Sequence, residues 1–259
     1  MEKAYLVTQN TNLKKILESE NIDILYFWEW ECEFNFISFL GNKKIINDLF
    51  WSNLSLTLLS PHLSNTSLLI FKKFIHTHLQ EISKSVQEFV VNDFGVLSIL
   101  SELFWKKKKI IFWNYLFNQQ KDPLLLFSDR PNKDVLGIDY NMYNDFFRKY
   151  DIKNIEIYNP IHGLIINNLD VNTYVYYPYV IQNITRYCNR SLIFDKINYS
   201  QIVDKCSGCK WKESIKFEQD LLWKKIYSIW NKTIYTNFSL SYISSKKAER
   251  IIYNYDIIK

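Results

Sequence analysis

Glycine and histidine are scarce in this chain, with five glycines and four histidines among 259 residues. Five scattered glycines cannot build a GxGxxG dinucleotide loop or a phosphate-binding P-loop. The sequence therefore indicates neither a dinucleotide-binding site nor a P-loop nucleotide-binding site. No HExxH pair, GxSxG elbow or readable Ser-His-Asp set occurs. The histidines do not group into a site, because they fall in a turn, a helix-like segment and a loop: His62, His76, His78 and His162. Peptidase chemistry therefore has little support.

Long apolar runs are also absent. No run approaches the roughly 18 residues that a membrane span needs, and the start MEKAYLVTQNTNLKK has no apolar core of a secretory signal. We therefore expect a cytoplasmic protein without a membrane span. Thiols stay reduced in that compartment, so its four cysteines favour metal binding or catalysis over disulfides.

The composition is that of an ordinary globular protein, 47% hydrophobic and 23% charged. No linker or repeat divides the chain, so we expect one domain over 1–259. The net charge of +5 is modest, and the one basic run is Lys106 to Lys109. This run is either a solvated turn before a strand or a phosphate contact for RNA.

Short apolar runs alternate with longer amphipathic segments, which is the pattern of a parallel sheet covered by helices. The runs predict strands over 22–28, 54–60, 88–93, 109–115, 154–159 and 172–180. Apolar residues at helical spacing predict helices over 11–20, 67–83, 95–107, 140–150 and 213–232. We predict an α/β fold, a complete or partial (β/α) TIM-like barrel with a C-terminal helix, and a doubly wound sheet as the alternative.

Four cysteines make up the whole thiol inventory: Cys32, Cys188, Cys206 and Cys209. Cys32 and Cys188 follow the first and sixth predicted strands, and the carboxyl ends of parallel barrel strands share one face. Cys206 and Cys209 form a CSGC turn in which Gly208 allows close backbone contacts to sulfur. A structural zinc site usually takes two short-spaced pairs, and only one is present. The pattern favours an iron–sulfur cluster, with zinc, or four unrelated buried thiols, as alternatives.

Two further residues are candidates for contacts to substrate. Asp93 follows the third predicted strand and precedes Gly95, so its carboxylate can act as an acid, a base or a hydrogen-bond anchor. Asn92 and Asp93 can equally cap the helix that begins near Gly95. Arg186, two residues before Cys188, can hold an anionic substrate as a bidentate fork or form a structural salt bridge.

Several of these segments, taken in order, resemble the collagenase-like peptidase superfamily and most closely its UbiU/UbiV branch, the iron–sulfur proteins of oxygen-independent ubiquinone biosynthesis. The segments lie within residues 20–215 and read LYFWEWEC, EFVVNDFGVL, KIIFWNYLFN, YYPYVIQNITRYC and CSGC. The early first cysteine and the close last pair are UbiV-like. The chain departs from the family in having Trp28 where a glycine is usual, and in its few glycines.

The resemblance implies a barrel that holds a 4Fe–4S cluster on Cys32, Cys188, Cys206 and Cys209. It also implies oxygen-independent hydroxylation, or support for it, and a heterodimeric partner of the same family. Other relatives hydroxylate tRNA or rRNA bases. Three hypotheses follow: a cluster protein in a biosynthetic hydroxylation of a small molecule, an RNA base hydroxylation factor, or a non-catalytic subunit with a structural metal site.

Overall fold

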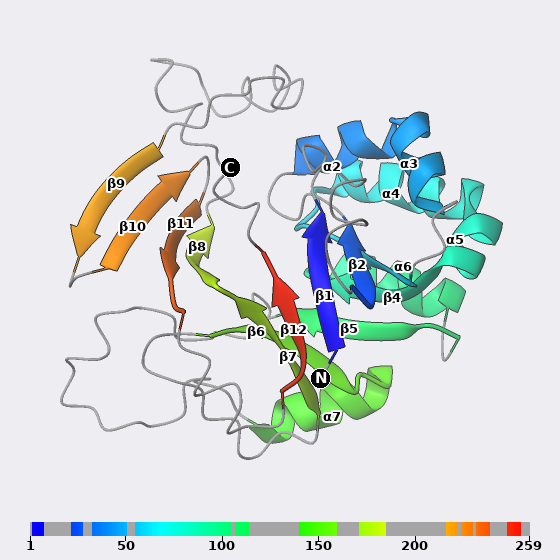
Figure 1. Cartoon of the computed structure of the whole chain (residues 1–259). Coiled ribbons are helices and arrows are strands. Elements are labelled where there is room, and N and C mark those ends of the chain that lie inside the picture. The colour runs from blue at the N-terminus through cyan, green and yellow to red at the C-terminus, as the bar shows by residue number, and fades with distance from the viewer. Residues whose placement is uncertain are drawn as a thin grey trace.

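A computed structural model gives the fold of this chain. The described residues are 2–7, 22–27, 33–50, 55–104, 107–113, 140–159, 171–184, 216–221, 224–229, 232–238 and 248–254. Within them the chain forms a closed parallel barrel, a set of helices outside it and a separate antiparallel sheet (Figure 1).

Eight parallel strands close the barrel in the order β1-β12-β7-β6-β5-β4-β3-β2. Their bounds are Glu2–Val7 (β1), Ile24–Phe27 (β2), Ser55–Leu59 (β3), Val86–Val91 (β4), Lys109–Trp113 (β5), Asn154–Tyr158 (β6), Asn172–Tyr177 (β7) and Ala248–Tyr253 (β12). The predicted TIM-like barrel is therefore confirmed in its complete form. The seam pairs β1 with β12, in the register Ala4 with Ile252.

Helices occupy the connections after β2, β3, β4 and β5. They are α2 (Glu33–Leu40), α3 (Lys43–Phe50), α4 (Asn65–Thr77), α5 (Leu79–Ser85), α6 (Phe94–Phe104) and α7 (Tyr140–Tyr150). The helices predicted over 67–83, 95–107 and 140–150 are confirmed, the first as the pair α4 and α5. The segment 11–20, predicted to be helical, lies outside the described residues. No helix among the described residues is long and apolar enough to cross a membrane.

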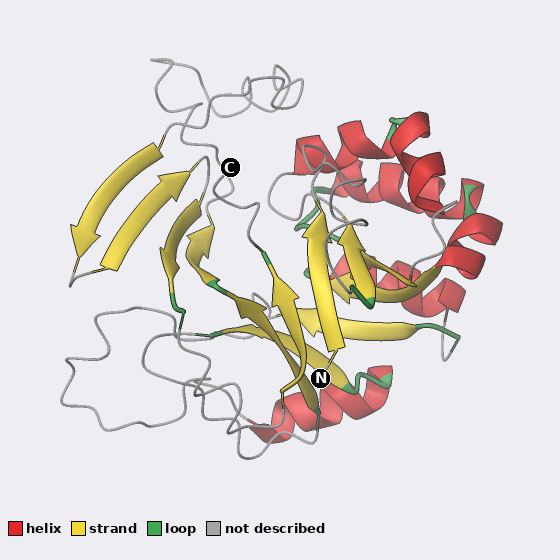
Figure 2. Cartoon of the chain, viewed as in Figure 1, coloured by secondary structure: helices red, strands yellow, loops and turns green. Residues whose placement is uncertain are grey.

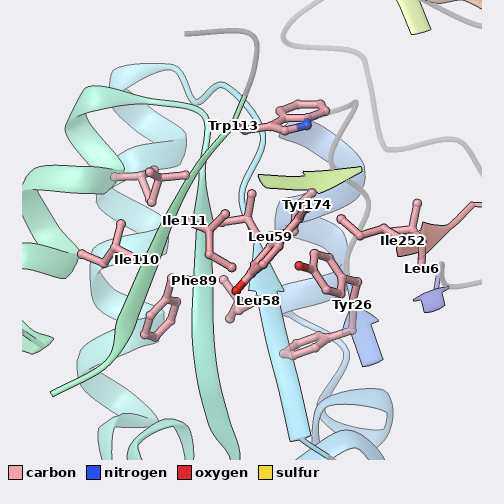
Figure 3. Packing of buried hydrophobic residues seen from close by; sticks show 14 of the residues in the cluster. Leu6, Tyr26, Leu58, Leu59, Phe89, Ile110, Ile111, Trp113, Tyr174 and Ile252 are labelled. Atoms are coloured by element: carbon pink, nitrogen blue, oxygen red, sulfur yellow. The ribbon is translucent and has the colours of Figure 1, made fainter. Parts of the chain in front are cut away.

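Side chains on the barrel strands alternate between the interior and the helices, as the pleat of a strand requires. On β4, Glu88 bonds to Arg250 across the interior, whereas Phe89 packs outward on Phe104 of α6 with ring centroids 5.1 Å apart. On β5, Phe112 packs on α7, whereas the next residue, Trp113, faces inward. Figure 3 shows this two-sided core, with Tyr26, Tyr174 and Trp113 on one side of the strands and Phe89 and Ile110 on the other.

A second sheet lies beside the barrel, on the side away from α2 to α6 (Figure 2). Its order is β8-β11-β10-β9, and all its pairs are antiparallel. The strands are β8 (Tyr179–Ile184), β9 (Lys216–Leu221), β10 (Lys224–Ile229) and β11 (Lys232–Thr236). The long helix predicted over 213–232 is wrong, because residues 216–221 and 224–229 are antiparallel strands in which Leu221 pairs with Lys224.

The second sheet is joined to the carboxyl end of the barrel by backbone and asparagine hydrogen bonds. A cis Tyr177–Pro178 peptide links β7 to β8. Asn254, just after β12, accepts from the Tyr179 amide at 3.2 Å and donates to its carbonyl at 3.0 Å. Asn237, just after β11, donates to the Asn159 carbonyl at 3.0 Å. Both asparagines are buried, and their side chains hydrogen-bond to backbone groups where the second sheet meets the barrel.

Candidate functional site

The carboxyl ends of β3 and β4 are held together by polar groups. The Ser60 amide donates to the Val90 carbonyl at 3.0 Å, and the Asn92 side-chain amide donates to the Ser60 carbonyl at 2.7 Å. Asn92 is fully buried, and its Oδ1 accepts no hydrogen bond from the described residues. This end of a parallel barrel is where barrel enzymes place their sites.

Asp93 caps the start of α6, so the capping interpretation is confirmed for Asp93 but not for Asn92, whose side-chain amide bonds to Ser60. Oδ1 of Asp93 accepts from the amides of Gly95 at 2.7 Å and Val96 at 3.3 Å. Its Oδ2 lies 3.9 Å from Nδ1 of His62, a histidine that the sequence analysis left out of any site. Burial raises the pKa of Asp93, but His62 and the backbone amides more than offset this and leave the pKa below its usual value. Asp93 is therefore an anion on the carboxyl face.

We expect Asp93→Ala to lower the free energy of unfolding by about 1 kcal/mol, because two amides of the first turn of α6 lose their acceptor. Asp93→Ser should retain most of the stability, since serine also caps. Urea unfolding measures both. Asp145→Ala on α7 is the matched control, because the ion pair of Asp145 with Arg148, at 3.5 Å, lies on the surface. A loss in Asp93→Ala no larger than in Asp145→Ala would contradict the capping role.

The other predicted site residues lie outside the described residues: Arg186, Cys32, Cys188, Cys206 and Cys209. Their places in the chain order are nevertheless defined by the elements around them. Cys32 directly precedes Glu33, the first residue of α2, whose Oε2 accepts from the Ser64 amide at 2.7 Å. The other three cysteines fall between β8 and β9. Among the described residues, no group of three or more His, Cys, Asp or Glu side chains is arranged to hold a metal.

Inside the barrel, towards the amino ends of the strands, Arg250 organises a charged network. Arg250 is 1% exposed and donates to both carboxylate oxygens of Glu88, one of them at 3.0 Å. It also donates to Glu2 across the seam at 2.6 and 2.8 Å, and to the Tyr26 hydroxyl at 2.9 Å. The guanidinium carbon lies 4.1 Å from the centre of the Tyr174 ring. The guanidinium group is planar and its charge is delocalised, so it can donate paired hydrogen bonds to carboxylates and stack on an aromatic ring at the same time.

Glu88 is ionised because of these neighbours. Burial raises its pKa, but Arg250 and Lys109 more than offset that effect and bring the pKa below its usual value. Lys109 Nζ lies 3.1 Å from Glu88 Oε1, and Thr57 Oγ1 donates to Glu88 Oε2 at 2.9 Å. Lys109 also donates to the Tyr174 hydroxyl. Every charge in this layer thus has a partner of opposite sign.

Glu156, a second buried carboxyl on β6, has a different environment. It is 0% exposed, and its Oε2 accepts from the Tyr176 hydroxyl at 2.6 Å. Its Oε1 has no hydrogen-bond partner among the described residues. Burial raises the pKa of Glu156 to about 8, although Tyr176, Tyr26 and Arg250 favour the ionised form. Glu156 therefore carries a proton at neutral pH.

Three buried aromatic rings lie at the carboxyl ends of β5, β6 and β7, in the same part of the interior as Glu156. Tyr158 and Tyr176 have ring centroids 5.1 Å apart, and Trp113 lies 6.2 Å from each. Tyr158 is on β6 two residues after Glu156, so both side chains face inward. From the amino ends to the carboxyl ends of the strands, the barrel interior thus contains first the paired charges, then the neutral Glu156, and then the aromatic rings.

Glu88, Glu156 and Arg250 were not predicted as site residues, although each leaves a signal in the sequence. Glu88 and Glu156 are single charges in the apolar segments EFVV and NIEIY, and Arg250 follows Glu249 at the start of the apolar segment of ERIIY. A charge in such a run occupies an inward position of a barrel strand or an exposed edge. Comparison with known proteins adds no further residue, because no protein-family model, curated protein or solved structure matches this chain.

Proposed function

We propose that this protein binds a 4Fe–4S cluster and takes part, with a related partner subunit, in an oxygen-independent hydroxylation or a similar biosynthetic modification. The observation that carries the proposal is the position of the four cysteines in the chain order. Cys32 falls in the connection after β2, and the other three fall in the connection after β8, which continues from the carboxyl end of β7. The connection after β2 leaves the end of the barrel where sites are built, and β8 begins just beyond that same end, at the carboxyl end of β7.

In this proposal the described residues supply the frame of the site. Glu33 and Asp93 fix the loop after β3, since Glu33 holds the Ser64 amide and Asp93 lies beside His62. Asp93 is left as an anion that can orient a substrate group near Asn92. Arg186, in the same connection as three of the cysteines, supplies a cation for an anionic part of the substrate. The cluster, when bound, supplies electron transfer or holds the loops together.

An RNA substrate receives less support from the basic run at the start of β5. Lys108 donates to the Ser83 carbonyl at 2.6 Å, and Lys109 pairs with Glu88 in the barrel. These two lysines are therefore engaged within the protein and lie at the amino end of the barrel strands. A small molecule bound at the carboxyl face is the better fit.

Iron and sulfide analysis of anaerobically purified protein tests the cluster. We expect a brown protein with about four irons and four sulfides per chain. Cys206→Ser should lose most of the iron and the visible absorption, because one of four thiolate ligands is removed. Asp93→Asn serves as the control and should retain both. A colourless wild-type protein that binds one zinc per chain would refute the cluster and leave a structural zinc site.

A further inference from the structure

Glu88 and Glu156 form a contrasting pair of buried carboxyl groups within one barrel interior. Glu88 has two cationic partners and a hydroxyl, and it is an anion. Glu156 has tyrosine hydroxyls beside it instead of cations in direct contact: Tyr176 donates to Oε2, Tyr26 lies nearby, and Oε1 has no hydrogen-bond partner among the described residues. Two carboxyl groups whose environments favour opposite protonation states are the arrangement from which enzymes draw an acid and a stabilising charge.

The hydrogen bond from Tyr176 favours Oε1 as the oxygen of Glu156 that carries the proton. Oε2 accepts from the Tyr176 hydroxyl, and an unprotonated carboxyl oxygen is the better acceptor. A buried polar atom without a hydrogen-bond partner lowers the stability of the folded protein. Such a cost is tolerated at functional sites, where a ligand atom completes the hydrogen bond.

The groups around Glu156 suit release and recovery of that proton. Ionised and hydroxyl groups face it from three other strands: Tyr26 on β2, Glu88 on β4, and Arg250 on β12. Tyr176 faces it from β7. Arg250 and the two hydroxyls stabilise the carboxylate once the proton has left, whereas Glu88 opposes ionisation. The acid is thus held neutral by burial, with stabilising groups in place for the anion.

The geometry points to Glu156 as the proton donor of a ligand site inside the barrel, beneath the aromatic rings of Trp113, Tyr158 and Tyr176. The ligand is a small molecule with an apolar part that packs on these rings and a basic oxygen or nitrogen that takes the Oε1 proton. Glu156 returns to the acid when a proton from solvent follows product release. This site goes beyond the proposed cluster and does not depend on the cysteines.

A small diazo compound, diazoacetamide, tests whether the proton of Glu156 is present and within reach of a small molecule. The diazo carbon takes the acid proton, the carboxylate oxygen attacks that carbon, and N₂ leaves, so an ester marks each acid that was protonated. Near neutral pH we expect Glu156 to be esterified in the folded protein and Glu88 to remain unmodified. Labelling of Glu156 should fall about tenfold for each pH unit above its pKa. Peptide mass spectrometry identifies the modified residue.

Two controls separate a reachable donor from a sealed structural acid. In urea near neutral pH Glu156 is solvated and ionised, so unfolding should reduce its labelling rather than increase it. Esterification of benzoic acid added to a parallel reaction verifies the reagent. Absence of a Glu156 ester in the folded protein, with the added acid esterified, would overturn the donor site. Iron analysis of the same sample reports separately on the cluster, so either proposal can fail alone.

Discussion

Arg250→Met is expected to lower the free energy of unfolding by about 3 to 5 kcal/mol, because it breaks a buried ion pair. The substitution leaves Glu88, which is 6% exposed, without its guanidinium partner. Lys109 then remains as the only cation within 4 Å of Glu88 among the described residues. Urea unfolding monitored by tryptophan fluorescence measures the change.

A second substitution identifies the cause of this loss. Glu88→Gln in the Arg250→Met background removes the buried charge, so the double variant should be more stable than Arg250→Met alone. Glu2→Gln is the matched control in the same background, because Glu2 is about half exposed and can be solvated. A single variant within about 1 kcal/mol of the wild type would show that the network contributes little.

Glu156→Gln is expected to change the pH dependence of stability rather than the fold. The folded pKa of Glu156 is about 8, and the ordinary value is 4.5. Between these values the folded protein holds a proton that the unfolded chain has lost, so stability falls as pH rises. The wild type should lose up to about 5 kcal/mol relative to Glu156→Gln across this window.

The measurement is a series of urea unfolding curves from about pH 5 to about pH 8.5, for both proteins. The difference between the two curves removes the contribution of every other titrating group. Glu88 and Asp93 have lowered pKa values, so they affect stability only as the pH falls below the ordinary carboxyl range. Parallel curves for wild type and Glu156→Gln would show that Glu156 is already ionised when folded.

The central strands were predictable from the sequence because they are buried on both faces. Runs such as IDILYFW and LSLTLLS contain few polar residues and are bounded by polar turns. The sequence therefore predicts both that these segments are strands and where they begin and end. The sixth predicted strand, 172–180, comprises two strands, because the Tyr177–Pro178 bond redirects the chain into the second sheet. Periodicity alone cannot show such a change of sheet.

The failures have equally specific causes. Strands β9 and β10 are antiparallel neighbours, but the two residues between them in the sequence are Leu-Trp instead of the Asn or Gly that marks a two-residue hairpin turn. Their apolar residues also match helical spacing, so a helix was predicted. Strand β12 was missed because Glu249 and Arg250 interrupt its apolar run. Only the barrel, by bringing Glu88 and Glu2 to Arg250, explains a charge there.

Closure of the barrel has a consequence for how the protein is made. Strand β1 pairs with β2 on one edge and with β12 on the other. Because β12 is synthesised almost 250 residues after β1, the second edge of β1 has no partner until then. Until then both edges of the growing sheet, and the charge of Glu88, lack their final partners. Non-local pairing of this kind slows folding and prolongs the exposure of strand edges. Strand edges of this barrel should therefore stay unpaired until β12 has been synthesised.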